Sequence, residues 1–451
     1  MVEMRPSVRR LTRQEFLLLG VGAGAGLALA GCGGGGPQNN PAVQGGAGGG
    51  GGKEYNGPKV DLGFWNGFTG GDGPFMRQLV EEFSTQHGNI NVKMNTVEWV
   101  NYYQQVPAAV RSGQGPDVAI MHVDQLATNA ARGVIIPLDD VASALQLKEG
   151  DFAPAVWEAG IYNNQRYGIP LDMHPFALYY NKTLMEQAGL DPNKPPQTRE
   201  EYEGALQEFK ANGIQGSWVS PFLFTGTFQW QTLLWQFGGD LYNEDATQAT
   251  FNSDAGVEAL TWMVDLVKNG HSPKNVAQDA ELVAYQNDKN AFHWNGIWQI
   301  NTFKEIDDLE WGVAPVPQIG SEKAVWANSH NFVIANKQPL DENKVQASKV
   351  FINWISQQSI EWAKAGQVPA RKSVRESQAF QSLEEQSQLA QQVPYVHFVP
   401  SVPGIADVQT TTFEQAVNEA VLLKKEPKAA LDEAASRADQ LLEENRQKYQ
   451  A

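Results

Sequence analysis

The sequence VDLGFW at residues 60–65, followed by segments 74–87 and 90–97, decides the fold class of this chain. The first and third segments predict strands, because they are rich in β-branched and aromatic residues or alternate between apolar and polar. The middle segment predicts a helix, because its apolar residues recur at helical spacing: Phe75, Leu79, Val80 and Phe83. This order predicts an α/β fold whose sheets are mostly parallel and flanked by helices. In such folds a ligand crevice lies beyond the carboxyl ends of the strands.

The same alternation continues towards the C-terminus. Residues 117–121 and 176–180 predict strands, and residues 291–298 predict a strand with a turn. Helices are expected at 100–111, 182–188, 199–212, 228–237, 254–268, 341–356, 407–423 and 427–448. No stretch of about 20 to 50 residues repeats along the chain, which excludes a solenoid or a propeller.

Composition narrows the class of protein. The chain has 451 residues, of which 42% are hydrophobic and 19% charged, and this favours a globular protein of about two to three domains. It has 34 basic and 51 acidic residues and a formal charge of −17, which argues against nucleic acid as a partner. The single cysteine excludes an internal disulfide framework and a zinc site made of thiolates.

The N-terminus predicts export and a lipid anchor. Basic residues precede an apolar run at 16–30, and this run ends in Leu29-Ala30-Gly31-Cys32. That ending is typical of a lipoprotein signal peptide over residues 1–31, with lipidation of Cys32. Thr12-Arg13-Gln14-Glu15 is similar to a twin-arginine motif, but Gln14 replaces the second arginine. The Gly-rich residues 32–58 predict a tether that holds the protein on the outer face of the membrane or in the periplasm.

Signatures of catalysis are scarce. The sequence contains no GxSxG, no HExxH and no strand-linked GxGxxG motif, so we expect no enzyme. His122-Val123-Asp124 and Asp172-Met173-His174 both follow predicted strands and together offer groups that can ligate a metal. Their number and spacing favour hydrogen-bonding groups at the lip of a crevice, and we expect no cofactor and no metal. An acid pair such as Asp72 and Asp124 keeps a glycoside hydrolase open as an alternative.

Aromatic residues give the positive signal. The chain has 13 Trp, 12 Tyr and 20 Phe, and several lie in turn-like segments where a core does not need them. Trp65 and Trp298 are both bracketed by Asn and Gly, and a flat indole in such a place can stack on the C–H face of a sugar ring. Four other tryptophans lie in periodic helices or a strand and are expected in the core: Trp262, Trp311, Trp354 and Trp362.

A succession of motifs resembles the extracellular solute-binding proteins of bacterial ABC importers, specifically the family 1 group that includes maltose-binding protein. The likeness covers residues 59–449 and rests on these stretches: Phe64-Trp65-Asn66, Gly115 to Val118, Tyr167 to Pro170, Tyr180-Asn181-Lys182, Asn295 to Trp298, Gly312 to Pro317, Asn331 to Ile334 and Gly366 to Arg371. It implies two α/β lobes joined by three crossings of the chain near 170–174, 326–330 and 366–371. The lobes are expected at 59–170 with 328–366, and at 171–327 with 367–451.

The resemblance also implies site residues. Trp65, Asn66, Met121 and Asp124 match first-lobe contacts of the family. His174 stands where maltose-binding protein has a carboxylate contact, and Trp298 matches its stacking tryptophan. The complete set of expected binding residues is Trp65, Asn66, Phe68, Asp72, Met121, Asp124, Asp172, His174, Trp230, Asn295, Trp298, His330 and Arg371.

The resemblance implies a monomeric, non-catalytic receptor that binds a carbohydrate and delivers it to the ABC permease. It would touch the membrane only through its lipid. Within the binding class, the alternative ligand is a phosphorylated polyol such as glycerol-3-phosphate. Such a ligand needs several arginine or lysine side chains around its phosphate, and Arg371 is the one arginine or lysine among the expected residues.

Overall fold

The computed structural model describes residues 54–449. The expected signal peptide at 1–31, the lipidation site Cys32 and most of the expected tether lie outside these residues. Within residues 54–449, no helix combines the length and the apolar composition that crossing a bilayer requires.

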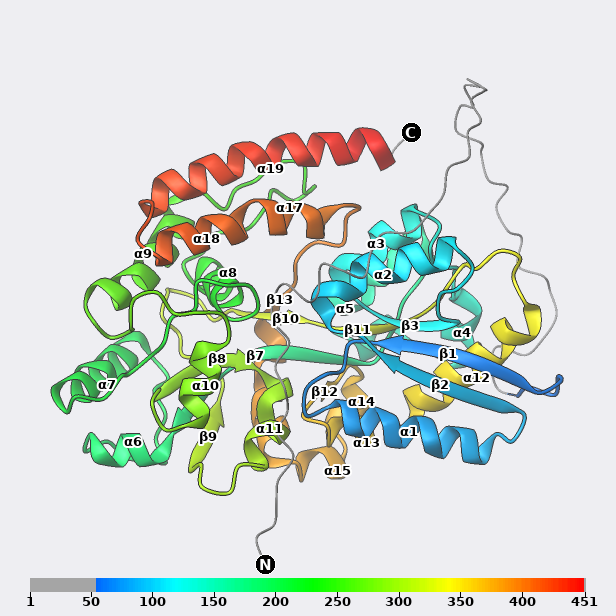
Figure 1. The fold of residues 1–451 in the computed structure, drawn as a ribbon, viewed down its shortest axis with the longest axis horizontal. Helices are drawn as coiled ribbons and strands as arrows, with labels where there is room; N and C mark the ends of the chain where they lie inside the picture. Colours follow the sequence, from blue (N-terminus) through cyan, green and yellow to red (C-terminus); the bar gives the residue numbers. More distant parts are fainter. Residues whose placement is uncertain (1–53, 450–451) are drawn as a thin grey trace, which may run out of the picture. The chain divides into compact units, whose positions relative to one another are not determined.

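The first sheet has the strand order β2-β1-β3-β11-β6 (Figure 1). Its strands are β1 (Val60–Asn66), β2 (Ile90–Thr96), β3 (Val118–His122), β6 (Ile169–Pro170) and β11 (His330–Ile334). Alternate residues of β1 face opposite sides, so Leu62 and Phe64 pack against α1 (Gly73–Gln86) and α12 (Glu342–Gln357). The other face carries α2 (Trp99–Arg111) and α3 (Val123–Ala131).

The second sheet is built around the ten-residue strand β7. Its strands are β7 (Asp172–Asn181), β8 (Phe292–Gly296), β9 (Trp311–Ala314), β10 (Val325–Asn328), β12 (Val368–Pro369) and β13 (Val396–His397). The first half of β7 pairs with β12 and β10, and its second half pairs with β8 and β9. All ten of its residues are buried, as expected for a strand covered on both faces.

The pairing of the strands corrects the expectation of mostly parallel sheets. In the first sheet β11 runs antiparallel to β3 and β6, and in the second sheet β7 pairs antiparallel with four strands. The remaining strands of each sheet share one direction. The reversed strands are β7, which follows β6, and β11, which follows β10, so each begins at one of the two short crossings between the sheets.

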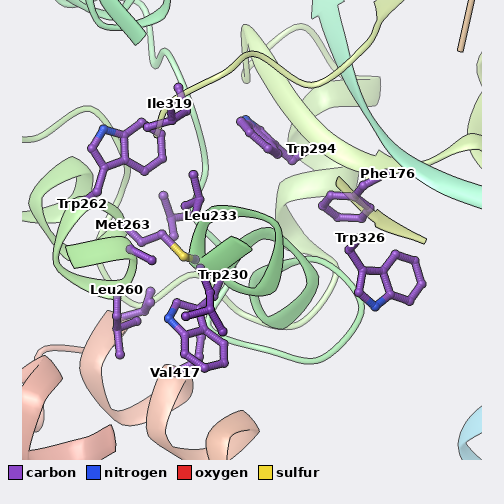
Figure 2. Packing of buried hydrophobic residues seen from close by; sticks show 14 of the residues in the cluster. Phe176, Trp230, Leu233, Leu260, Trp262, Met263, Trp294, Ile319, Trp326 and Val417 are labelled. Carbon is purple, nitrogen blue, oxygen red and sulfur yellow. The ribbon is translucent and has the colours of Figure 1, made fainter. Parts of the chain in front are cut away.

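The largest core lies beside the second sheet. It is aromatic, and Figure 2 shows Trp230 of α8 (Gly226–Gln236) among Leu233, Leu260, Met263 and Val417. The helices that cover it are α9 (Asp254–Lys268), α18 (Phe413–Val421) and α19 (Pro427–Tyr449). Trp262 and Trp362 are buried as expected, whereas Trp311 and Trp354 are only partly buried.

Most expected helices are present with ends shifted by a few residues. The others are α4 (Asp139–Ala144), α5 (Pro154–Ala159), α6 (Lys182–Gln187), α7 (Arg199–Ala211), α10 (Ala280–Gln286), α11 (Ile300–Lys304), α13 (Ser359–Ala363), α14 (Lys372–Arg375), α15 (Gln378–Gln381), α16 (Glu384–Leu389) and α17 (Ile405–Thr411).

The single helix expected at 407–423 is wrong. The chain breaks at Thr412, with φ −126° and ψ −97°, between α17 and α18. The Thr412 hydroxyl donates to the carbonyl of Val408 at 2.7 Å, so it competes with the backbone donors that would continue the helix.

Candidate functional site

The chain passes between the two sheets in very short steps. Pro170 ends β6 in the first sheet, and Asp172 begins β7 in the second. Asn328 ends β10, and His330 begins β11. The Leu171 N–H donates to the His330 carbonyl at 2.9 Å, so these two crossings are bonded to each other. A third connection, from α13 to β12, contains Gly366 at φ +104°, a conformation that favours glycine.

The carboxylate of Asp172 lies where these connections meet and is fully buried. It accepts hydrogen bonds from the His330 backbone N–H at 3.0 Å and from His330 Nδ1 at 2.8 Å. It also accepts from His174 Nδ1 at 3.2 Å and from the indole N–H of Trp362 in α13 at 2.7 Å. Burial alone would raise the pKa of Asp172, but these partners outweigh it and hold the pKa below its ordinary value. A single carboxylate thus links the segments at all three connections.

Three imidazoles converge beside this carboxylate. His122 at the end of β3 lies directly opposite His330 of β11, and their ring centroids are 4.9 Å apart. His174 of β7 stacks on His330 with centroids 4.2 Å apart and lies 5.4 Å from His122. Burial lowers the pKa of His122, and it lowers that of His174 to about 4, so both rings are neutral at pH 7.

Aromatic side chains surround the imidazoles. The ring centroid of Trp99 lies 4.4 Å from that of His122, and the Trp99 ring stacks nearly parallel to the ring of His330. The ring centroid of Trp298 lies 5.9 Å from that of His174. Each of the two indoles covers a glycine, Gly67 under Trp99 and Gly296 under Trp298, and a Cβ atom at either glycine would overlap the ring. We call Trp99, His122, Asp172, His174, Trp298 and His330 the crossing site. It joins aromatic surface to hydrogen-bonding groups from both sheets.

Two acidic residues flank the crossing site. Asp72 precedes α1, and its Oδ2 accepts from Gln367 Nε2 at 3.2 Å, while its Oδ1 is buried and has no hydrogen-bond partner in the described part of the chain. Burial raises the pKa of Asp72 to about 6. Asp124 in the first turn of α3 accepts from Asn328 Nδ2 at 3.1 Å, and burial raises its pKa as well. Each carboxyl group therefore accepts a hydrogen bond from a residue at a crossing: Asp72 from Gln367 beside the third connection, and Asp124 from Asn328 at the second.

The structure brings part of the predicted set together. Asp172, His174, Trp298 and His330 belong to the crossing site, and Phe68 lies 4.9 Å from the His330 ring. Other predicted residues support the site from the first sheet. The Oδ1 of Asn66 accepts from the Phe68 N–H at 3.2 Å, and half-buried Trp65 packs beside Met121 and Tyr102.

Three predicted contacts need correction. Trp230 is fully buried in the core, and its indole N–H donates to the Gly256 carbonyl at 3.2 Å, so it belongs to the packing of α8 and α9. Met121 is also fully buried, in an apolar cluster with α2. The amide of Asn295 is engaged by His293 and by the N–H of Gly296. Trp230 was predicted as part of an aromatic helical segment, Met121 from the resemblance and Asn295 from its turn-like surroundings, and the structure turns each of them into the interior.

Arg371 lies apart from the imidazoles in the chain, two residues after β12. Its Nη2 is buried and has no hydrogen-bond partner within residues 54–449, and burial lowers the pKa of Arg371.

Sequence reasoning missed Trp99, Tyr103 and Asn328. Trp99 begins α2 directly after the strand β2, just as Trp65 lies near the end of β1, so its position carried the same signal. Tyr103 follows one helical turn later, and its hydroxyl lies 2.7 Å from His122 Nδ1. Asn328 lies inside the expected second crossing, which was read as a connection rather than as a source of side chains.

Known structures share this fold. A cyclic α-maltosyl-1,6-maltose binding protein from Arthrobacter globiformis has a TM-score of 0.72 at 24% identity, with coverage of 86% of this chain and 100% of that one. The GacH receptor of Streptomyces glaucescens has a TM-score of 0.76 at 21% identity, with coverage of 86% and 99%. These likenesses confirm the predicted two-lobed α/β fold.

Curated relatives and a family model agree with the structures. A putative binding protein of Brucella abortus is 22% identical over 82% of this chain and 90% of its own length. The sn-glycerol-3-phosphate-binding periplasmic protein UgpB of Escherichia coli is 24% identical over 84% and 92%. The model of the family described as bacterial extracellular solute-binding protein matches residues 69–358, well over half of the chain. The resemblance found in the motifs is confirmed, and the chain belongs to the bacterial extracellular solute-binding protein family, a family of binding proteins that act outside the cytoplasm.

Proposed function

We propose that this protein captures a carbohydrate between its two lobes and delivers it to the membrane permease of an ABC importer. The observation that carries the proposal is the crossing site, where the half-buried indole of Trp298 lies beside imidazole and carboxylate groups. Sugar rings present an apolar C–H face and a polar rim, and such a site matches both. The names of similar structures, which include maltose, mannotriose and tagatose complexes, support the same class of ligand.

The place of the site supports a mechanism of closure. Lobe one would comprise residues 59–170 with 328–366, and lobe two would comprise 171–327 with 367–451. Trp99, His122 and His330 then come from lobe one, and His174 and Trp298 come from lobe two. A ligand that contacts both sets at once favours the closed arrangement by its differential affinity for that state. The short crossings at 170–172 and 328–330 would absorb the change of backbone angles.

Two observations favour a second ligand. UgpB is similar over most of this chain, and Arg371 has a buried guanidinium nitrogen without a partner among residues 54–449, as a phosphate-binding group would have before its ligand arrives. A phosphorylated polyol is therefore the second candidate.

A thermal-shift panel tests the proposal. Purified protein would be melted with maltose, maltotriose, mannotriose and sn-glycerol-3-phosphate, followed by calorimetry of every hit. A ligand at about one hundred times its Kd stabilises the native state by about 2.7 kcal/mol, so a true ligand moves the transition clearly. A shift with glycerol-3-phosphate and with none of the sugars would overturn the carbohydrate proposal. Recovery of cleaved fragments after long incubation would instead support a hydrolase.

We also propose that the mature protein is held by lipid on Cys32, because Leu29-Ala30-Gly31-Cys32 is typical of the end of a lipoprotein signal peptide. The variant Cys32→Ser expressed in a bacterial host should move from the membrane fraction to the soluble exported fraction. If the variant still partitions with membranes as the wild type does, the anchor lies elsewhere.

A further inference from the structure

The three histidines of the crossing site present ring nitrogens that all lie within 4.8 Å of one another. They come from three strands. His122 and His330 are direct partners in the antiparallel pairing of β3 with β11, and His174 is supplied by β7 of the second sheet. The rings of His174 and His330 are buried, and that of His122 is half-buried. The chain has 7 histidines in all, so three of them gather at one point.

Each of these rings is already held at Nδ1. Asp172 accepts from Nδ1 of His174 at 3.2 Å and from Nδ1 of His330 at 2.8 Å, and the Tyr103 hydroxyl lies 2.7 Å from Nδ1 of His122. In all three rings Nε2 is therefore the nitrogen left for a ligand. A histidine that binds a metal through one nitrogen usually donates its other N–H to a carboxylate or another oxygen, which fixes the tautomer and the orientation of the ring.

We propose that His122, His174 and His330 form a binding site for one divalent transition-metal ion, coordinated through their Nε2 atoms. Three imidazoles suit Zn²⁺, Cu²⁺ or Ni²⁺, whereas Ca²⁺ and Mg²⁺ require oxygen ligands. Protein Zn–N bonds of about 2.0–2.1 Å place tetrahedral nitrogens about 3.4 Å apart. The ring nitrogens lie up to 4.8 Å apart, so the rings must move closer together on binding, which small rotations of the side chains can supply. Three protein ligands leave one position for water or for an oxygen of another molecule.

The pairing of the strands explains why spacing along the sequence did not indicate this site. The two short motifs at 122–124 and 172–174 supply only one ligand each. The third ligand, His330, comes from a strand that reaches this place after a separation of 208 residues from His122 in the chain. An ion here would tie both sheets at their crossings, next to Trp298. This goes beyond the proposed binding of a carbohydrate and does not depend on it.

Calorimetry with ZnCl₂ on chelator-treated full-length protein tests the site. We expect one ion per chain. His122→Gln removes a ligand from the most accessible of the three rings and should weaken Zn²⁺ binding by at least about tenfold, as should His174→Gln. Tyr103→Phe keeps an aromatic ring but removes the partner of His122 Nδ1, and it should weaken binding by about 10- to 100-fold. The matched control is His271→Gln, since His271 is partly exposed and lies outside the cluster, three residues beyond the end of α9.

A spectroscopic measurement on the wild type keeps the proposal open to refutation if a variant fails to fold. Bound Cu²⁺ should show hyperfine coupling to imidazole nitrogens in electron paramagnetic resonance. Absence of stoichiometric binding by the folded wild type, or equal affinity in His122→Gln and His271→Gln, would overturn the metal site. The thermal-shift panel with sugars, repeated in the presence of chelator, tests the proposed function independently of the metal site. Sugar shifts that survive while Zn²⁺ fails to bind would leave the proposed function standing and reject only the metal.

Discussion

Two aromatic clusters in this protein look alike in sequence and differ in what they do. The cluster around Trp230 is a closed apolar core, where Leu233, Leu260 and Met263 surround the indole and its N–H reaches a backbone carbonyl of the same region (Figure 2). The crossing site places Trp298 beside His174, which is held by the buried carboxylate of Asp172. Its members come from segments that are distant in the chain.

The difference teaches how to locate a binding site from aromatic content. An aromatic residue on a helix surrounded by apolar neighbours is satisfied by packing alone, and its burial supplies stability. Aromatic residues at strand ends, next to polar groups from other segments, leave both surface and hydrogen-bonding capacity for a ligand. Composition shows that a chain is rich in tryptophan, and topology decides which tryptophans meet polar partners.

Truncation in the core should give the largest effect on stability. The Trp230 side chain is fully buried, so Trp230→Ala leaves a large cavity. We expect a loss of about 3–5 kcal/mol in the free energy of unfolding. Urea denaturation of the unliganded protein measures the loss, and Trp230→Phe should recover part of it. Ligand affinity of the folded fraction should stay within a few-fold of the wild type. A large loss of affinity in a stable Trp230→Ala protein would contradict the division into two kinds of cluster.

Truncation at the crossing site should act on binding instead. Trp298→Ala removes a ring that we propose stacks on a sugar, so the dissociation constant should rise about thirty- to a thousand-fold, which corresponds to about 2–4 kcal/mol. The melting temperature should change less than in Trp230→Ala, because Trp298 is only partly buried. Titration calorimetry measures the affinity, with Trp298→Phe as the variant that retains a stacking ring. Unchanged affinity together with a large fall in melting temperature would make Trp298 a core residue.

The carboxylate of Asp172 shares a property with each of the two clusters. It is fully buried like a core residue, but it accepts hydrogen bonds from residues at the connections between the two sheets. In Asp172→Asn an amide N–H faces donors from His174, His330 or Trp362, so we expect a loss of about 1–3 kcal/mol of stability at neutral pH. The pKa of Asp172 is lowered in the folded state, so its ionised form contributes stability above its ordinary pKa of 3.8, and this contribution is lost as the pH falls below that value.

The gap in stability between the wild type and Asp172→Asn should therefore shrink in acid, and denaturation measured at neutral pH and near pH 3 checks it. The control is Asp117→Asn. Asp117 is also buried, but it pairs with Lys337 and Lys344, away from the crossings. If Asp172→Asn alone changes the amplitude of the ligand-induced change in small-angle scattering, the carboxylate governs closure. Equal behaviour of the two variants would make Asp172 an ordinary buried acid.

The sequence predicted the elements well and the site in part, for physical reasons. The apolar faces of α1 and α9 and the strands β1, β3 and β7 are local patterns, and each formed near its expected place. The break between α17 and α18 was not predicted, although it also has a local cause. The hydroxyl of Thr412 donates to the carbonyl of Val408, and this bond competes with the backbone hydrogen bonds of a continuous helix. Local patterns thus predict elements wherever side chains do not compete with the backbone.

The site depended on pairing over long distances. Trp298 and His174 were singled out by their local sequence and then matched to family contacts through resemblance, and the structure places their ring centroids 5.9 Å apart. The meeting of His122 with His330 requires the antiparallel register of β3 with β11, which no local pattern contains. Trp230 was misread for the converse reason, because residues from α9 and α18 close around it and its indole N–H is satisfied by the Gly256 carbonyl.

The smallest expected effect concerns Asp72, which flanks the crossing site. Burial raises the pKa of Asp72 to about 6, so the folded protein binds a proton there more tightly than the unfolded chain, in which the ordinary value is 3.8. Its ionised form therefore reduces stability above about pH 6, and this reduction disappears as the pH falls from about 6 to below 4. Asp72→Asn imitates the protonated acid and keeps an oxygen for Gln367, so we expect it to stabilise the protein by on the order of 1 kcal/mol at pH 8 and by almost nothing near pH 3.5. Melting curves at these two pH values measure the difference.

Asp61→Asn is the matched control, since Asp61 is exposed and the hydrogen bonds of Asn91 and Lys93 lower its pKa, so that variant should gain nothing at either pH. A destabilised Asp72→Asn at pH 8 would mean that the ionised carboxylate is held by a partner at the crossings, and Asp72 would then belong with Asp172 among the residues that join the two sheets.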